Sequence, residues 1–346
     1  MNIQQLFGIE LPIVQAPMAG VQGGAMTVAV SNAGGLGSLP CAMLTPDGLR
    51  SELQQITAQT DRPYNLNFFC HVPPAPDAAR EARWRAALAP YYAEFGIDAS
   101  RIPAGGGRAP FSADMADLIE PFRPPVVSFH FGLPPPDLLA RVKRWGSKVL
   151  SSATTVEEAR WLEAHGADAV IAQGLEAGGH RGIFLSDDLS TQVGTMALLP
   201  QVVRAVKLPV IAAGGIADRE GVVAALGLGA AGVQVGTSYL LCAEATTTAL
   251  HRAALKGERA EHTALTNLIT GRPARGMLNR LMKELGPLSE APPAFPLATA
   301  ALAPLKAAAE KLGRDDFSTL WSGQNASGCR EIPAAELTRL LAGMAD

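Results

Sequence analysis

The sequence is poor in cysteine and in aromatic residues. Its 346 residues include four cysteines, and aromatic side chains make up 5% of them. Cys41, Cys70, Cys242 and Cys329 lie far apart and form no CxxC pair, which argues against a disulfide scaffold and a clustered zinc site. We therefore expect free thiols in a reducing cytoplasm.

An excess of one charge is also missing. The chain carries 29 Lys and Arg residues against 32 Asp and Glu residues, which gives a formal net charge of −3. Without a basic excess or a basic run, we expect no nucleic-acid partner and no anionic membrane surface. The amino terminus has no positive region followed by an apolar run, so a signal peptide is not expected.

Membrane, metal and serine-hydrolase motifs are absent as well. The uncharged stretch from Gly221 to Ala243 is long enough to span a bilayer, but its glycines and polar residues indicate a helix, a turn and a buried strand. No cluster of His, Asp and Glu has metal-ligand spacing, and no GxSxG motif occurs. We expect a soluble protein without a metal.

What the sequence does contain is a hydrophobic fraction of 48%, arranged in short apolar runs. Most runs are continuous rather than alternating, as expected of parallel strands buried on both faces. Helical stretches separate them, including one after Thr155 and one after Asp218, a predicted N-cap. The runs begin at Ile13, Gly35, Tyr64, Val126, Lys148, Ala169, Val210 and Gly232.

Strands that alternate with helices in this way predict an α/β fold, a TIM-like (β/α)8 barrel. We expect residues 1–69 and 126–243 to form the barrel. An insertion at 70–125 and a mostly helical region at 244–346 are expected to form a smaller second domain near the substrate. A doubly wound open sheet is the alternative, although no GxGxxG motif follows the first strand.

Gly-rich turns follow the seventh and eighth predicted strands. They contain Gly214 and Gly215, and then Gly236 and Thr237. Glycine lets the backbone approach an anion closely, and a helix N-terminus presents unpaired N–H groups, so these turns suit a phosphate. The alternative is that the glycines only form tight strand-to-helix turns.

Two histidines are candidates for proton transfer. His180 lies in a Gly-Gly-His-Arg-Gly stretch, predicted to be a flexible loop, where an imidazole of near-neutral pKa suits proton abstraction. A merely solvated histidine is the alternative there. His130 lies between two phenylalanines, which slightly favours a buried histidine with satisfied hydrogen bonds. The other histidines have no motif around them and are expected to be ordinary: His71, His165, His251 and His262.

Neutral amides also lie at the ends of predicted strands, at Asn67, Gln173 and Gln234. Such groups can bond the carbonyl and N–H edge of a flat heterocycle without adding charge. The alternative is that they satisfy backbone groups where the barrel opens.

Several motifs in a fixed order carry a family resemblance over nearly the whole chain. They are QAPMAGV from Gln15, LNFF from Leu66, SFHFGLP from Ser128, AQGLEAGGHRG from Ala172, IAAGGI from Ile211, QVGT from Gln234, TGRPARG from Thr270 and LWSGQ from Leu320. Together they resemble the class I nitronate monooxygenases. SFHFGLP and EAGGHRG are the most specific of these motifs.

The resemblance implies a TIM-like barrel that binds one FMN non-covalently. His180 matches the family's proposed catalytic base, and His130 matches its other active-site histidine. The implied reaction oxidises an alkyl nitronate with O₂ to a carbonyl compound and nitrite, with propionate 3-nitronate as the expected natural substrate. The residues that match the FMN contacts are Met18, Asn67, Gln173, Gly178, Gly179, Gly214, Gly215, Gln234, Val235, Gly236 and Thr237.

The resemblance leaves the substrate pocket and the assembly open. Phe295 stands where the family usually has a tyrosine, and Arg272, Arg275 or Lys306 could pair with a substrate carboxylate. A homodimer is one option.

Two rival functions remain open: an NAD(P)H-dependent FMN reductase of quinones or enoyl groups, and a flavin-binding protein without turnover. The SFHFGLP motif argues against the first rival, and an intact His180 stretch argues against the second.

Overall fold

Eight parallel strands form a barrel in the computed structural model, which describes residues 2–103 and 108–344. Their order is β1-β9-β8-β6-β5-β4-β3-β2, and a parallel bridge from Val14 to Leu36 joins the two edges. The TIM-like barrel is therefore confirmed, and the open doubly wound sheet is wrong. The strands are β1 (Ile13–Gln15), β2 (Gly37–Pro40), β3 (Tyr64–Phe69), β4 (Val126–His130), β5 (Lys148–Ala153), β6 (Ala169–Gln173), β8 (Val210–Ala213) and β9 (Gly232–Val235).

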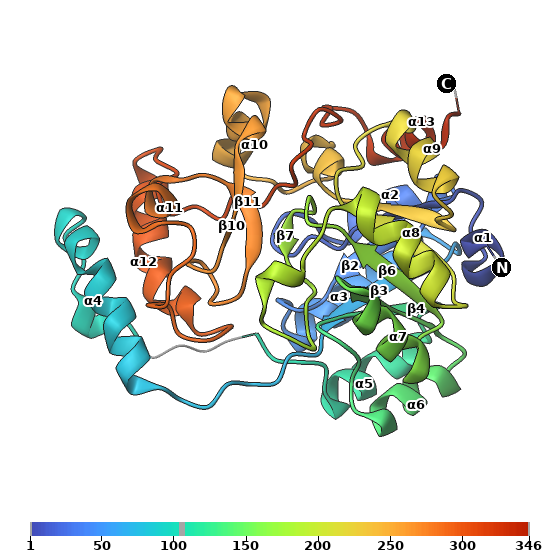
Figure 1. Ribbon diagram of the computed structural model, residues 1–346, viewed down its shortest axis with the longest axis horizontal. Helices are drawn as coiled ribbons and strands as arrows, with labels where there is room; N and C mark the ends of the chain where they lie inside the picture. Colours follow the sequence, from blue (N-terminus) through green and yellow to red (C-terminus); the bar gives the residue numbers. More distant parts are fainter. Residues whose placement is uncertain (1, 104–107, 345–346) are drawn as a thin grey trace.

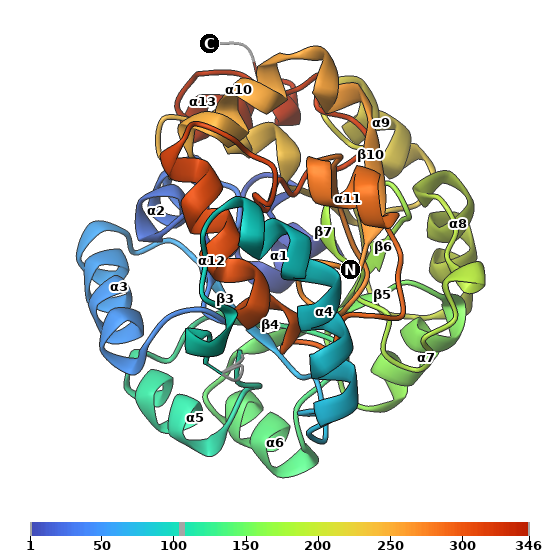
Figure 2. The ribbon, with the colours of Figure 1, turned by 90° about the vertical axis from the view of Figure 1, so that its left-hand side faces the viewer.

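A ring of helices surrounds the barrel, as Figure 2 shows. Side-chain caps fix where two of them begin: Thr155 accepts from the N–H of Glu158, and Asp218 accepts from the N–H of Gly221 at 2.8 Å. The predicted cap at Asp218 is thus confirmed. The ring helices are α2 (Gly24–Asn32), α3 (Pro46–Gln59), α5 (Ala113–Ile119), α6 (Pro136–Arg144), α7 (Val156–Ala164), α8 (Thr195–Ala205) and α9 (Arg219–Gly227).

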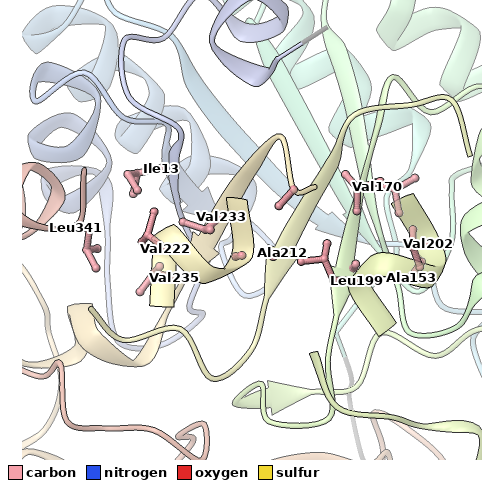
Figure 3. Close-up of a cluster of buried hydrophobic side chains, with 14 of the residues drawn as sticks. Ile13, Ala153, Val170, Leu199, Val202, Ala212, Val222, Val233, Val235 and Leu341 are labelled. Atoms are coloured by element: carbon pink, nitrogen blue, oxygen red, sulfur yellow. The ribbon is translucent and has the colours of Figure 1, made fainter. Parts of the chain in front are cut away.

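Successive strand residues face opposite sides of the barrel wall, and each side has its own core. Val170 of β6 and Val233 of β9 pack outward against the helices, as Figure 3 shows. Ile171 points into the barrel and joins an inner cluster that also contains Ile3 of α1 (Ile3–Phe7). A Cβ on Gly232, which begins β9, would lie 2.1 Å from Cδ1 of Ile3. Helix α1 therefore closes the end of the barrel where the strands begin.

A second group of elements covers the opposite end of the barrel (Figures 1 and 2). In it, Trp84 donates to the carbonyl of Ala298 at 3.1 Å, and the Tyr92 hydroxyl donates to the carbonyl of Ala301 at 2.7 Å. These bonds join segments from the two regions predicted to lie outside the barrel. The elements are α4 (Ala78–Glu94), α10 (Ala249–Lys256), α11 (Arg280–Leu285), α12 (Ala298–Lys311), and a three-stranded sheet of β10 (Thr263–Thr266), β11 (Ala274–Met277) and β7 (Gly179–His180).

Each of those two regions also gives one helix to the barrel. Helix α5 packs against α3 and α6, and α13 (Ala334–Ala342) packs against α2 and α9. Leu341 of α13 belongs to the outer core in Figure 3. Among the described residues, no helix is both long enough and apolar enough to cross a bilayer.

The approach of α2 to β2 generates a stability prediction. A Cβ on Gly37 would lie 2.0 Å from the carbonyl oxygen of Thr27, so the backbones must move apart to admit any side chain. Gly37→Ala should lower the free energy of unfolding by about 1–3 kcal/mol or more, measured by urea denaturation.

Gly227→Ala, at the exposed end of α9, is the matched control. A Cβ there meets nothing within 4 Å. Its stability should stay unchanged or rise by up to about 1 kcal/mol. Equal losses in the two variants would contradict the close approach at Gly37.

Candidate active site

A cavity of about 290 Å³ lies at the end of the barrel where the strands finish. Its walls combine strand ends, the turn after β1, and side chains from the covering elements, such as His251, Lys306 and Trp321. In barrels of this kind the active site is built at this end. The cavity is therefore the candidate active site.

The cavity brings together all but one of the predicted site residues. Val235 is the exception, because it is only 1% exposed and packs in the outer core. Gln234 precedes it in the same strand and faces the cavity, so strand alternation turns the Val235 side chain away. The residues that line the cavity are Met18, Asn67, His130, Gln173, Gly178, Gly179, His180, Gly214, Gly215, Gln234, Gly236 and Thr237.

His180 lies in a strand, so the prediction of a flexible loop is wrong. Gly179 and His180 form β7, which pairs antiparallel with Ala274 and Arg275 of β11. The partner strand is far along the chain, and a two-residue strand has no pattern of its own. Tertiary pairing, which no local signal predicts, therefore holds this histidine.

Arg181 fixes the same segment to the end of β6. Its guanidinium is fully buried and donates to the carbonyls of Gly174 at 2.7 Å and Gln173 at 2.8 Å, and to Oε1 of Gln192 at 3.0 Å. Burial lowers the pKa of this guanidinium to about 10, so it stays charged at neutral pH. Sequence reasoning did not single out Arg181, although its place beside His180 was a signal.

The side-chain amide of Gln173 also forms hydrogen bonds with the backbone of the segment that contains His180. Its Oε1 accepts from the N–H of Gly182 at 2.7 Å, and its Nε2 donates to the carbonyl of His180 at 2.9 Å. Of the two roles open for Gln173 in the sequence, these contacts match the one that satisfies backbone groups. Gln173 thus helps to position β7.

The His180 imidazole lies in an aromatic, positively charged environment. Its Nε2 is 2.9 Å from Oγ1 of Thr270, and its ring lies 5.3 Å from that of Phe295, centroid to centroid. Burial, and next the charge of Arg108, lower the pKa of His180 well below its ordinary value. The pKa therefore lies below the near-neutral one expected from the sequence, and at pH 7 the ring is neutral and able to accept a proton, as a weaker base than an ordinary histidine.

His130 lies beside His180 and is satisfied on both ring nitrogens. Nδ1 is 3.0 Å from Oγ of Ser152, and Nε2 is 3.2 Å from the carbonyl oxygen of His180. Burial lowers the pKa of His130 to about 3. The favoured interpretation, a buried histidine with its hydrogen bonds made, agrees with these contacts, although the ring also lines the cavity.

The structure adds two histidines that the sequence predicted to be ordinary. His251 is 2% exposed and lines the cavity, and its Nε2 has no hydrogen-bond partner among the described residues. His71 packs edge-on against Phe295, with ring centroids 4.8 Å apart. Neither has a motif around it: packing between distant segments brings His251 into the cavity wall and His71 against Phe295, which lies beside His180.

Unpaired backbone donors gather on one wall of the cavity. The N–H groups of Gly215, Gly236 and Thr237 donate to no acceptor in the described part of the chain. Gly214 and Gly215 have φ angles of 113° and 74°, which residues other than glycine rarely adopt. Oγ1 of Thr237 accepts from the N–H of Gly323 at 2.9 Å, so its own proton is available to a ligand. This wall is suited to an anionic group.

Of the three cations predicted to meet a substrate carboxylate, Lys306 alone lines the cavity. Arg275 donates to the carbonyl of Leu175 at 2.9 Å. Arg272 donates to the carbonyl of Ile183 and lies over the ring of Phe131, with its Cζ 4.1 Å from the centroid. Both arginines are therefore engaged in holding the protein fold.

The buried His251 makes stability depend on pH. Burial lowers its pKa to about 4, against about 6.5 in an unfolded chain. Between these values the unfolded chain binds more protons, so stability falls as the pH falls, by up to about 1.4 kcal/mol per unit. In urea denaturation between pH 6.5 and 4, His251→Gln should remove this contribution to the decrease in the free energy of unfolding with falling pH. An unchanged slope would contradict the assignment.

Known proteins match the chain over nearly its full length. A sequence profile described as "Nitronate monooxygenase" matches residues 2–343. A nitronate monooxygenase from Pseudomonas aeruginosa is 45% identical over 340 residues, which cover 97% of this chain and 97% of that protein.

Two solved structures share the fold over nearly the whole chain. Nitroalkane oxidase from Streptomyces ansochromogenes has a TM-score of 0.89 at 40% identity, covering 99% of this chain and 96% of that one. FabK from Thermotoga maritima has a TM-score of 0.72 at 27% identity, covering 99% and 95%. The resemblance carried by the motifs is thus confirmed, and the chain belongs to the nitronate monooxygenase family.

Proposed function

We propose that the protein oxidises alkyl nitronates, propionate 3-nitronate among them, with O₂ and with FMN bound in the cavity. The products are a carbonyl compound and nitrite. The observation that carries the proposal is the meeting of His180 with the unpaired backbone donors of Gly215 and Gly236 in one cavity. Membership of the nitronate monooxygenase family supports it.

The residues present fit FMN. The unpaired N–H groups of Gly215, Gly236 and Thr237 suit a phosphate. At such turns the backbone can come close to the phosphate oxygens, and its N–H groups are available to donate hydrogen bonds to them. The amide of Gln234 and Oδ1 of Asn67 make no hydrogen bond to described residues, so they suit the polar edge of the ring system. Bound FMN would supply the one-electron chemistry between nitronate and O₂.

The chain itself would supply the proton transfer. A nitronate is already deprotonated, whereas a neutral nitroalkane must first lose its α-proton. The His180 ring is neutral at pH 7 and can accept that proton, while Thr270 holds its Nε2. The main chain of β7 keeps the ring fixed at the cavity.

Oxygen uptake tests the proposal directly. The purified protein should carry FMN, identified by mass spectrometry of the released chromophore. Propionate 3-nitronate should then drive O₂ uptake with nitrite release, and NADH alone should not. Uptake or flavin bleaching with NADH, and none with the nitronate, would instead support the nicotinamide-dependent reductase.

His180→Asn separates the base role from a binding role. The variant should lose about 100-fold or more in kcat/KM with neutral nitroalkanes, because it lacks a general base. Turnover of the corresponding nitronates should fall much less, with flavin content as the control for folding. Equal losses on both substrates would contradict the base role.

A further inference from the structure

Arg108 is a cation in the cavity wall that lacks an anionic partner. Its Nη1 is buried without a hydrogen-bond partner, and its Nη2 lies 3.6 Å from Sδ of Met43, a weak acceptor. Its Cζ lies 5.8 Å from the ring centroid of Phe295. No carboxylate of the described residues forms an ion pair with it.

Arg108 is partly exposed, but a charged donor that is buried without an acceptor, as its Nη1 is, remains costly, so the arrangement points to a missing ligand. The other guanidiniums at this site each have oxygen acceptors: Arg181 has three, Arg275 donates to Leu175 and Thr263, and Arg272 donates to Ile183, although its own Nε is unpartnered. Arg108 differs from them because its guanidinium has no oxygen acceptor among the described residues, and its unpartnered Nη1 is buried. It lines the 290 Å³ cavity and also borders a neighbouring cavity of about 470 Å³.

The position of Arg108 suits one end of a small bifunctional substrate. Phe295 contacts both Arg108, at 5.8 Å from Cζ to ring centroid, and His180, at 5.3 Å between centroids. Because Arg108 and His180 also line the same cavity, a small molecule bound there with its reacting carbon at His180 can direct its other end toward the guanidinium. Lys306 is less suited, because Glu310 lies 4.0 Å from its ammonium group.

We propose that Arg108 binds the carboxylate of the substrate and makes the enzyme selective for carboxylate-bearing nitronates over neutral ones of similar length. This inference rests on the proposed oxidation of nitronates. A guanidinium can donate two parallel hydrogen bonds to a carboxylate, which gives both affinity and orientation.

Selectivity between two substrates tests this role. Arg108→Met keeps an unbranched apolar stem and removes the charged guanidinium. With propionate 3-nitronate its kcat/KM should fall about 10- to 100-fold, and with the nitronate of 1-nitrobutane less than about threefold. Arg108→Lys should retain part of the selectivity, because it keeps the charge and loses the bidentate geometry.

Lys306→Met is the matched control, since it removes the other cation of the cavity wall. Its selectivity ratio should change by less than about threefold, because Lys306 already has a carboxylate beside it. Equal losses by Arg108→Met on both nitronates would overturn the proposal. A larger loss of selectivity in Lys306→Met than in Arg108→Met would overturn it as well.

A binding measurement separates this inference from the proposed reaction. Succinate is a dianion of similar length that cannot be oxidised in this way, and butyrate lacks its second carboxylate. In calorimetric titration of the flavin-loaded protein, succinate should bind about tenfold more tightly than butyrate, and Arg108→Met should abolish the difference. That result without any nitronate oxidation would leave the anion site standing and refute the reaction. Equal affinities in the unaltered protein would refute the anion site.

Discussion

The geometry of the candidate active site depends on the fully buried guanidinium of Arg181, which donates to the carbonyls that end β6, those of Gln173 and Gly174. His180 directly precedes this arginine, so these bonds set the position of the histidine relative to the barrel. Arg275 of β11 donates to the next carbonyl along, that of Leu175, at 2.9 Å. Since a buried charge without acceptors is costly, the turn after β6 and the sheet above it hold each other in one arrangement.

Positive charge and burial act together on the histidines of the cavity. Burial disfavours the imidazolium of His180, and Arg108 adds a repulsive charge, so the ring stays neutral at pH 7 and can accept a proton. The same charge on Arg108 favours an anionic ligand in the cavity. One arrangement thus keeps the proposed base unprotonated and attracts the proposed substrate, which connects the electrostatics of the site to its specificity.

The sequence predicted the barrel well, because buried parallel strands form continuous apolar runs that local composition marks clearly. It also predicted residues at or just after the strand ends, such as Asn67 and Gly215, since the topology of a barrel brings strand ends together. The side chain of Val235 could have been excluded by the twofold alternation of a strand, which places it opposite Gln234.

What the sequence could not predict comes from contacts between distant segments. The β7–β11 pairing that orders His180, and the arrival of His251 and Arg108 in the cavity wall, depend on how the covering elements fold over the barrel. The pKa of His180 follows from the same packing, since burial and Arg108 together lower it. The local sequence around these residues does not predict such long-range contacts.

A crystal structure of the protein purified with its bound chromophore is the most direct test of the site. We expect FMN in the cavity, with its phosphate within hydrogen-bonding distance of the N–H groups of Gly215, Gly236 and Thr237, and with its ring system beside His180. A chromophore bound elsewhere, or a phosphate held by other residues, would contradict the assignment of this cavity as the flavin site.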